Sequence, residues 1–320
     1  MNDQIITIDV FRAKDVTVVD GVLLGEKLSF ADELVMDDIF AVSSKAQMKQ
    51  LDLQTTDTGL RRADGGRHPV HLDCCLTLMA PDGSTHDALV LVEEKDGLVA
   101  AIYLMALGDI VMDRRYRLVG LTRQTATRRF AEAAAGSFAR GTQITLANGR
   151  MQSIEDLTPG DLILTRDAGK QPLRQISHAT LRATGHFAPV VITKGTLHNE
   201  NDLVLRPDHR VFVYQRSDLL GAGRAQILVK ARHLVDDIRV LRRPGGFVDY
   251  FQLIFDDHHI IYAEGIAAES HLVDARTRAA LPDTASGPLH RHRAHMDYEV
   301  SQNLIDPATA TALLRRASSM

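Results

Sequence analysis

The sequence lacks several features that mark large classes of proteins. It has no tryptophan and only 5% aromatic residues, which leaves little material for the stacking surfaces used to bind single-stranded nucleic acids. Its 37 basic and 41 acidic residues give a net charge of -4, without the basic excess expected of a nucleic-acid-binding protein. We therefore expect no nucleic-acid partner.

Cysteine and long apolar runs are also scarce. The chain has two cysteines, Cys74 and Cys75, and neighbouring cysteines are poorly placed for an ordinary disulfide. The first residues lack the basic and apolar regions of a secretory signal, and no stretch approaches ~18 consecutive apolar residues. The sequence predicts a soluble protein with no membrane partner and a cytoplasmic location by default. A C-terminal export signal would escape this test.

The chain does contain enough apolar residues for sizeable cores, since 45% of its 320 residues are hydrophobic. Residues 1–120 show short apolar runs at 76–79, 88–92 and 98–103. Turn signals separate these runs, and together they predict an antiparallel meander. We expect residues 1–120 to form a β-rich domain of unknown role, which is also where an unidentified protein partner would bind.

The next segments differ from residues 1–120 in composition and in the pattern of their apolar residues. Residues 121–136 are rich in alanine and predict a helical connector, with Gly136 placed as the left-handed residue that ends the helix. Residues 137–272 contain many brief apolar runs separated by Gly, Pro and Asp, which indicates an all-β domain. Residues 273–320 are predicted to be a polar tail with a short helix. The fold class is therefore mainly β.

Four blocks in the second half carry a family resemblance. They are, in chain order, residues 136–164, the run Leu205-Arg206-Pro207-Asp208-His209-Arg210-Val211, residues 231–235, and residues 250–265. In this order they resemble the Hint domain, the autoprocessing module shared by Hedgehog proteins and inteins, and in particular its bacterial branch. The resemblance covers about residues 137–272 and implies a flattened, horseshoe-shaped all-β domain.

The first block also contains two turn signals that can be understood without the family. Asn148-Gly149 between apolar alternations predicts a type I′ hairpin. Thr158-Pro159-Gly160-Asp161 places Pro and Gly where a type II turn needs them. Both are expected to be structural.

The resemblance assigns chemistry to Ser137. In Hint families the residue at this position, usually Cys, attacks the carbonyl directly upstream, so the Gly136–Ser137 bond is nominated as scissile. The attack is intramolecular, which gives the nucleophile a high effective concentration. A serine would form an oxygen ester, and it needs a neighbouring base because its hydroxyl is a weaker nucleophile than a thiol.

Two histidines match positions of the family's motifs. His209 corresponds to the central histidine, which protonates the departing amide nitrogen and is expected to titrate near neutrality. His259 corresponds to the histidine of a later block. Ser137, His209 and His259 are therefore the candidate catalytic residues.

Four positions depart from the family. Arg206 stands where relatives carry a small hydroxyl residue, and Ser137 replaces the usual Cys. Glu269 and Ser270 occupy the places of the His-Asn pair that ends splicing inteins, so splicing is not expected.

Two functions follow from these residues. The first is autoprocessing by an N-to-O acyl shift at Gly136–Ser137, leading to N-terminal cleavage without splicing, with the chain's own N-terminal segment as substrate. The second is a catalytically retired Hint scaffold that acts as a structural or interaction module.

A metal-dependent hydrolase is a weaker third interpretation. No zinc spacing is found in the segment from His71 to Cys75, and the adjacent His258 and His259 would point to opposite faces of a strand. The basic segment with His290, His292 and His295 is typical of a solvated linker. We expect neither a metal nor a cofactor.

Overall fold

The computed structural model describes residues 5–56, 59–64, 66–214 and 226–274 and the single residues 277, 290 and 298. The chain is mainly β, as predicted, and separates into two compact units. Unit 1 contains Met1–Ala133 and Thr184–His186, and unit 2 contains Ala134–Ala183 and Phe187–Met320. The division falls within the helix α1 (Ala126–Ala134). The polar tail predicted for residues 273–320 lies almost wholly outside the described residues.

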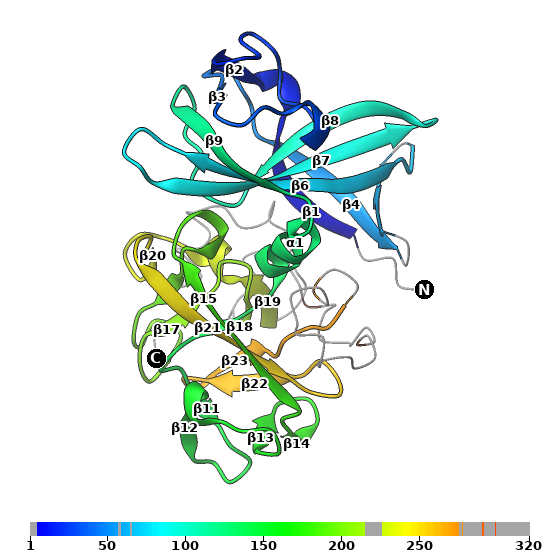
Figure 1. Cartoon of the computed structure of the whole chain (residues 1–320). Coiled ribbons are helices and arrows are strands. Elements are labelled where there is room, and N and C mark those ends of the chain that lie inside the picture. Colours follow the sequence, from blue (N-terminus) through cyan, green and yellow to red (C-terminus); the bar gives the residue numbers. More distant parts are fainter. Residues whose placement is uncertain are drawn as a thin grey trace. The chain divides into compact units, whose positions relative to one another are not determined.

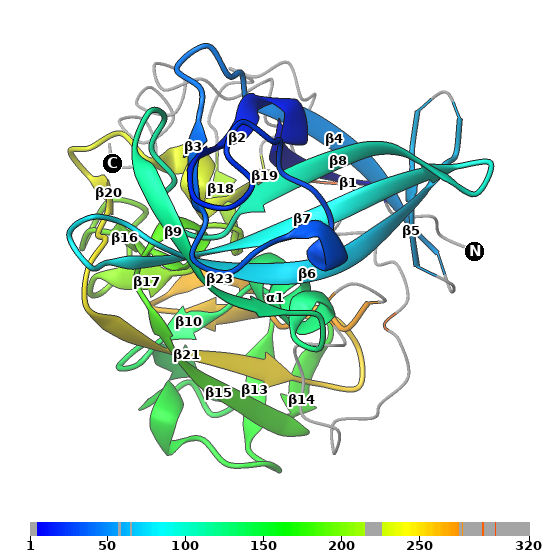
Figure 2. The same cartoon turned by 45° about the horizontal axis from the view of Figure 1, so that its top comes forward.

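Unit 1 is built on a single antiparallel sheet (Figures 1 and 2). Two 3₁₀ turns, η1 (Ala13–Asp15) and η2 (Ala31–Glu33), interrupt its strands. Its strands are β1 (Ile5–Arg12), β2 (Val16–Asp20), β3 (Ile39–Val42), β4 (Lys49–Thr56), β5 (Gly59–Arg62), β6 (Pro69–Met79), β7 (Thr85–Lys95), β8 (Leu98–Ala106) and β9 (Arg115–Thr122).

The sheet of unit 1 closes on itself. The strand order runs β2-β3-β9-β6-β5-β4-β1-β8-β7, and β7 also pairs with β6. Six strands, β6-β5-β4-β1-β8-β7, therefore form a closed barrel, because each of them is hydrogen-bonded to two neighbours. The predicted meander is confirmed as β6, β7 and β8, and it supplies half of this barrel.

Cys74 and Cys75 lie on β6 and are both buried and free. Cys74 packs in the main hydrophobic core of unit 1 with Leu76 and Val90. The two thiols are thus core residues, and burial raises the pKa of Cys75 to about 12.

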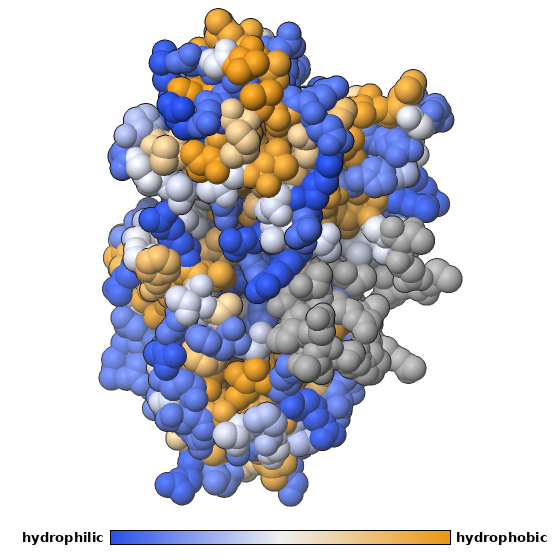
Figure 3. Space-filling view, in the orientation of Figure 1, coloured by the Kyte–Doolittle hydropathy of each residue, from blue (hydrophilic) through white to orange (hydrophobic). Residues whose placement is uncertain are grey.

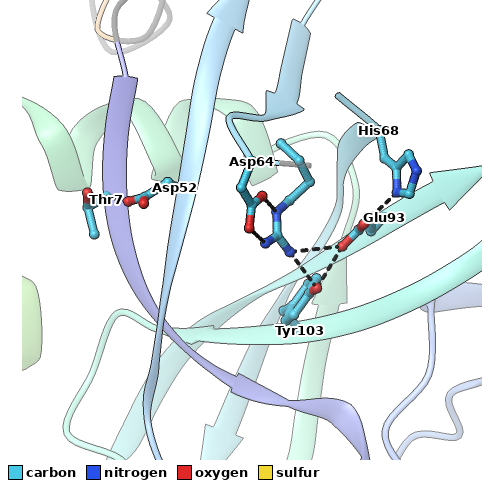
Figure 4. A network of polar contacts seen from close by, with 7 residues as sticks. Thr7, Asp52, Asp64, His68, Glu93 and Tyr103 are labelled. Carbon is cyan, nitrogen blue, oxygen red and sulfur yellow. Dashed lines mark hydrogen bonds and ion pairs between the residues drawn. The ribbon is translucent and has the colours of Figure 1, made fainter. Parts of the chain in front are cut away.

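A polar network joins β5, β7 and β8 at one place in the barrel wall (Figure 4). Glu93 accepts hydrogen bonds from Tyr103 (2.7 Å) and Arg62 (3.2 Å), and lies 2.8 Å from His68 Nδ1. Burial alone raises the pKa of Glu93, but the hydrogen bonds from Tyr103 and His68 outweigh it and lower that pKa. The buried carboxylate is therefore satisfied by its own neighbours in the fold.

The loop after β2 presents apolar side chains outward. Figure 3 shows hydrophobic residues on the surface of unit 1 near β2 and β3, where Val22 and Leu24 are 76% and 67% exposed. The backbone of this loop is held from inside by the buried Asp38, which accepts from the amide of Val22 at 2.6 Å. The exposed side chains therefore project from a fixed backbone.

Unit 2 contains two antiparallel sheets with a common hydrophobic core. The first sheet has the order β15-β21-β10-β17-β16-β20. Its strands are β10 (Phe138–Ala139), β15 (Gln175–Arg182), β16 (Val190–Ile192), β17 (Leu203–Leu205), β20 (Val240–Arg242) and β21 (Phe247–Ile254).

The second sheet has the order β12-β11-β22-β23-β18-β19, with β13 and β14 attached beside β22. Its strands are β11 (Gln143–Thr145), β12 (Met151–Ser153), β13 (Leu162–Thr165), β14 (Gly169–Pro172), β18 (Arg210–Tyr214), β19 (Gln226–Lys230), β22 (Ile260–Ala263) and β23 (Ile266–Glu269). The 3₁₀ turns of unit 2 are η3 (Ile154–Asp156) and η5 (Ala231–Leu234).

One of the two predicted turns needs correction. The hairpin between β11 and β12 exists, but only Gly149 and not Asn148 has a positive φ, so the turn is not type I′. The amide of Gly149 donates to Leu146 and that of Leu146 to Arg150, which is the pattern of a type I turn followed by a left-handed glycine. The type II turn is confirmed, with Gly160 at φ 100° and the Asp161 amide donating to Thr158.

The connecting helix is shorter than expected and ends differently. It covers Ala126–Ala134, and Gly136 does not have the positive φ of a left-handed helix end. A glycine is needed there for a different reason, which is the close approach of buried side chains described below. None of the helices among the described residues is long and apolar enough to span a membrane.

Candidate active site

The Gly136–Ser137 peptide lies near the N-terminal start of unit 2, which begins at Ala134. Ser137 directly precedes β10, a short strand between β17 and β21 in which Phe138 pairs with Leu205 and Phe251 (Figure 2). The carbonyl of Ser137 accepts a hydrogen bond from the amide of Arg206 at 3.1 Å. The nominated bond is therefore fixed at the edge of a short ladder and not in a free loop.

The side chain of Ser137 is buried. Its exposed fraction is 1%, and its Oγ has no hydrogen-bond partner among the described residues. A buried hydroxyl without a partner is costly, so such groups often mark functional sites.

His209 reaches the same peptide from the turn that follows β17. The amide of His209 donates to the carbonyl of Arg206 at 3.0 Å, and Pro207 lies between them in the position that a tight turn favours. The imidazole is 1% exposed and packs on the ring of Phe138, with centroids 4.3 Å apart. A surface position after Pro207 is thus excluded.

The His209 imidazole and the Glu269 carboxylate flank the space into which a side chain on Gly136 would project. A Cβ placed on Gly136 would lie 3.1 Å from Nδ1 of His209 and 3.2 Å from Oε1 of Glu269. Only a residue without a side chain fits this gap comfortably. The structure therefore places His209 and Glu269 beside Gly136, the residue that directly precedes Ser137.

The protonation state of His209 differs from the sequence prediction. Burial lowers the pKa of His209 to about 4, although the charge of Glu269 opposes this shift. A histidine that titrates near neutrality was expected, but this imidazole is neutral at pH 7. It is therefore ready to accept a proton, and it can donate one only after accepting it.

Glu269, at the end of β23, is the charged centre of the site. It is 3% exposed and accepts from the backbone amide of Arg210 at 3.1 Å, while the Arg210 guanidinium lies 3.2 Å from its other oxygen. His258 Nε2 is 3.5 Å from Glu269 Oε2. Burial raises the pKa of Glu269, but the Arg210 charge, the hydrogen bond from His258 and the charges of His258 and His209 together outweigh burial and hold that pKa well below its usual range.

A further histidine, His271, lies two residues beyond Glu269. It is 2% exposed, and its amide donates to the carbonyl of Leu253 on β21 at 3.0 Å. Burial lowers the pKa of His271 to about 3, and the backbone of Gly136, which lies within reach of the ring, opposes this shift. No motif in the sequence indicates a role for His271, which follows the end of β23 by two residues.

Arg206, the departure from the family pattern, is buried against two aromatic rings. Its guanidinium carbon lies 4.9 Å from the ring centre of Phe187 and 5.5 Å from that of Tyr250. These are cation–π distances. The contact of Arg206 with Ser137 is made by its backbone amide, so it does not depend on the type of side chain at position 206.

His259 has other neighbours. Its Nδ1 is 2.9 Å from Asp167 Oδ2, its ring packs edge-on against Phe255, and its amide donates to Ser270 Oγ at 2.9 Å. Of the two adjacent histidines, it is His258 that contacts the carboxylate beside Gly136. A catalytic role for His259 stays a prediction.

The residues considered as metal ligands are spread among other contacts. His71 pairs with Glu94 at 3.0 Å, and Asp73 accepts from the amide of Ala31 at 2.7 Å. Within the described ranges, no group of three or more His, Cys, Asp or Glu side chains could hold a metal ion. His292 and His295 lie outside the described residues.

One comparison, with protein-family models, matches the region of the sequence blocks. A family model described as the Hint domain matches residues 136–275. Three solved chains match, among them the crystal structure of the gp41-1 intein, which is 12% identical. That match covers 42% of this chain and 97% of the intein, with a TM-score of 0.26. No curated protein matches the chain.

Proposed function

We propose that the Hint domain matched at residues 136–275 cuts its own chain at the Gly136–Ser137 bond. The reaction is an N-to-O acyl shift followed by release of residues 1–136, without splicing. The observation that carries this proposal is the position of the His209 imidazole, whose Nδ1 lies 3.1 Å from where a Cβ on Gly136 would be, next in the chain to the buried Ser137.

The first step forms the ester. Ser137 Oγ attacks the carbonyl carbon of Gly136, and its proton passes to the neutral imidazole of His209. Burial keeps His209 neutral at pH 7, the form that accepts a proton, although the lowered pKa makes it a weaker base than an exposed imidazole. The tetrahedral intermediate then has an Oγ–C bond, a C–N bond and a negative oxygen.

The second step breaks the peptide. His209, now protonated, gives its proton to the amide nitrogen of Ser137, and the C–N bond breaks to leave an ester and a free amine. The Glu269 carboxylate stabilises the transient imidazolium, because its charge raises the proton affinity of His209. One histidine thus moves one proton from oxygen to nitrogen, and the balance needs no other donor.

The third step releases the fragment. Water attacks the ester carbonyl, the C–Oγ bond breaks, and Ser137 recovers its hydroxyl. The products are residues 1–136 with a C-terminal carboxylate and a fragment that begins with Ser137. Glu269 and Ser270 replace the His-Asn pair of splicing inteins, so no second cut is expected.

A retired scaffold is the second candidate function, and one observation favours it. Ser137 Oγ makes no hydrogen bond to a base, and the ring nitrogens of His209 make none within the described residues. Catalytic hydrogen bonds are often loose before the reaction, so this observation alone does not decide between the two functions.

Intact-mass analysis of the purified full chain decides between them. On incubation with hydroxylamine, the wild type should release residues 1–136 as a hydroxamate, and Ser137→Cys should do so faster because a thiol is the better nucleophile. Ser137→Ala should remain whole. His209→Gln in the Ser137→Cys background should slow release by about 10²–10⁴-fold. If neither the wild type nor Ser137→Cys yields a fragment, the chain is a scaffold.

A further inference from the structure

The strand register places His271 beside the scissile peptide. Phe138 pairs with Phe251 on antiparallel strands, so position 136 lies opposite position 253 if the ladder is extended by two residues. The amide of His271 donates to the carbonyl of Leu253 at 3.0 Å. Glu269, two residues before His271, lies beside Gly136, with its Oε1 3.2 Å from where a Cβ on Gly136 would be. His271 is therefore in the same buried neighbourhood as the scissile peptide.

The side chain of His271 is buried without a settled partner. The residue is 2% exposed, and neither ring nitrogen makes a well-aligned hydrogen bond within the described residues. The ring is nevertheless close enough to the Gly136 backbone for that backbone to raise the pKa of His271 against burial.

We infer that His271 is a further catalytic residue, which donates a hydrogen bond to the carbonyl oxygen of Gly136 as negative charge develops there. This inference rests on the proposed function, since it assigns the group that stabilises the oxyanion of the first step. Stabilising an oxyanion needs a donor aimed at the oxygen in a site without water, and a hydrogen bond that is loose at rest can tighten as charge develops.

A neutral imidazole suits this task. Burial keeps His271 uncharged at pH 7, so one ring nitrogen carries a hydrogen and the other does not. A neutral imidazole N–H can polarise a carbonyl without carrying a full charge into the site. The nearby Glu269 already pairs with Arg210, so a second buried cation is not required for charge balance.

The two histidines then have separate tasks. His209 lies on the α-carbon side of Gly136 together with Glu269 and moves the proton. His271 faces the backbone of Gly136 from the β21 side and holds the oxygen. The division explains why two imidazoles with lowered pKa values surround one peptide.

The test compares variants of His271 in the full-length Ser137→Cys chain. His271→Gln keeps a hydrogen-bond donor of similar size, whereas His271→Leu keeps the size and removes the donor. We expect His271→Leu to slow hydroxylamine-induced release by about 10²–10³-fold, which is typical of losing one oxyanion donor. His271→Gln should stay within about tenfold of its parent.

The control is His233→Gln. Burial lowers the pKa of His233 to about 4, as in the other two histidines, but its ring contacts Arg232. The His233→Gln variant should therefore leave the rate of release unchanged. Urea unfolding of each variant in the Ser137→Ala background shows whether the fold persists, and His271→Ala replaces His271→Leu if the latter does not fold.

Each result has one meaning. If Ser137→Cys with native His271 releases no fragment, the proposed function fails and the role of His271 fails with it. Suppose instead that the parent cleaves. If His271→Leu, or its replacement, then cleaves as fast as the parent, or if His271→Leu and His271→Gln are slowed equally, only the inference on His271 is overturned. A selective loss in the variant without a donor supports the inference.

Discussion

The ring of His209 packs on the ring of Phe138 with their centroids 4.3 Å apart and their planes inclined by 59°. Phe138 is bonded to Ser137, so this contact ties the imidazole to the segment that is proposed to be cut. Phe138 is itself 1% exposed and belongs to the core shared by both sheets of unit 2. The position of the proposed proton carrier is therefore set by the packing of the domain.

Replacing Phe138 by Leu should loosen His209 while the core stays filled. We expect Phe138→Leu in the Ser137→Cys chain to slow release by about tenfold to 10²-fold, because a misplacement of about 1 Å can cost that much. The measurement is the rate of fragment formation by intact mass. Phe255→Leu is the matched change, since Phe255 packs on His259. An equal loss in that variant would point to His259 instead of His209.

The buried pair of Glu269 and Arg210 should be far more sensitive than an exposed pair. Glu269→Gln removes the buried carboxylate that pairs with the half-buried Arg210, which we expect to lower the free energy of unfolding by about 3 kcal/mol. Asp256→Asn breaks the exposed pair with Arg174, where both side chains are more than half exposed, and should cost at most about 1 kcal/mol.

Urea unfolding of the two single variants in the Ser137→Ala background gives both values. Glu269→Gln should also slow release in the Ser137→Cys chain, because His209 loses the charge that raises its proton affinity. Equal stability losses for Glu269→Gln and Asp256→Asn would contradict the assignment of Glu269 as the charged centre of the site.

A methyl group on Gly136 should disturb both groups beside it. The added Cβ of Gly136→Ala would lie 3.1 Å from His209 Nδ1 and 3.2 Å from Glu269 Oε1, so both must move by a few tenths of an ångström. We expect a stability loss of about 1 kcal/mol, at the lower end of the cost of overpacking. In the Ser137→Cys chain, release should slow by at least tenfold, which a time course by mass can detect. Unchanged release would show that the imidazole does not act from this position.

The buried histidines predict a stability that falls in mild acid. His209, His233 and His271 have pKa values lowered to about 4, 4 and 3 by burial, against 6.5 in the unfolded chain. Between these values the unfolded state binds more protons than the folded state. Stability is therefore fully present above about pH 7 and is lost as the pH falls from 6.5 towards 4.

The loss can be measured by urea unfolding of Ser137→Ala between pH 7.5 and 5. Each histidine contributes a slope of up to about 1.4 kcal/mol per pH unit. His209→Gln cannot take up a proton there, so it should reduce the slope by one such contribution. A flat profile over this range would mean that the histidines become solvated or protonated within the fold.

Much of the site was accessible to sequence reasoning, but its electrostatics were not. Ser137 and His209 were identified from motif blocks, and the structure brings them to the same peptide. The sequence showed only that Glu269 stands where splicing domains have a histidine. Its place beside Gly136 arises from the fold and not from its position in a motif. The titration of His209 was misjudged because burial is a property of tertiary packing.

The same limit applies to the fold. The strands β6, β7 and β8 were predicted because their turns are local and carry strong residue signals. Closure of the barrel was not, since it depends on pairings such as Ile6 with Leu53 and Phe11 with Leu104, which are distant in sequence. At Asn148 and Gly136, a positive φ was inferred from residue type, but neither residue has one in the folded chain, where neighbouring contacts set the backbone angles.

The ring of strands in unit 1 has a consequence for the severed product. All nine of its strands lie between Ile5 and Thr122, and each finds its main-chain partners inside that interval. Cleavage after Gly136 would thus break no hydrogen bond between strands of the barrel. The released fragment would keep all of its strand pairing and would expose no new strand edge that could pair with another chain.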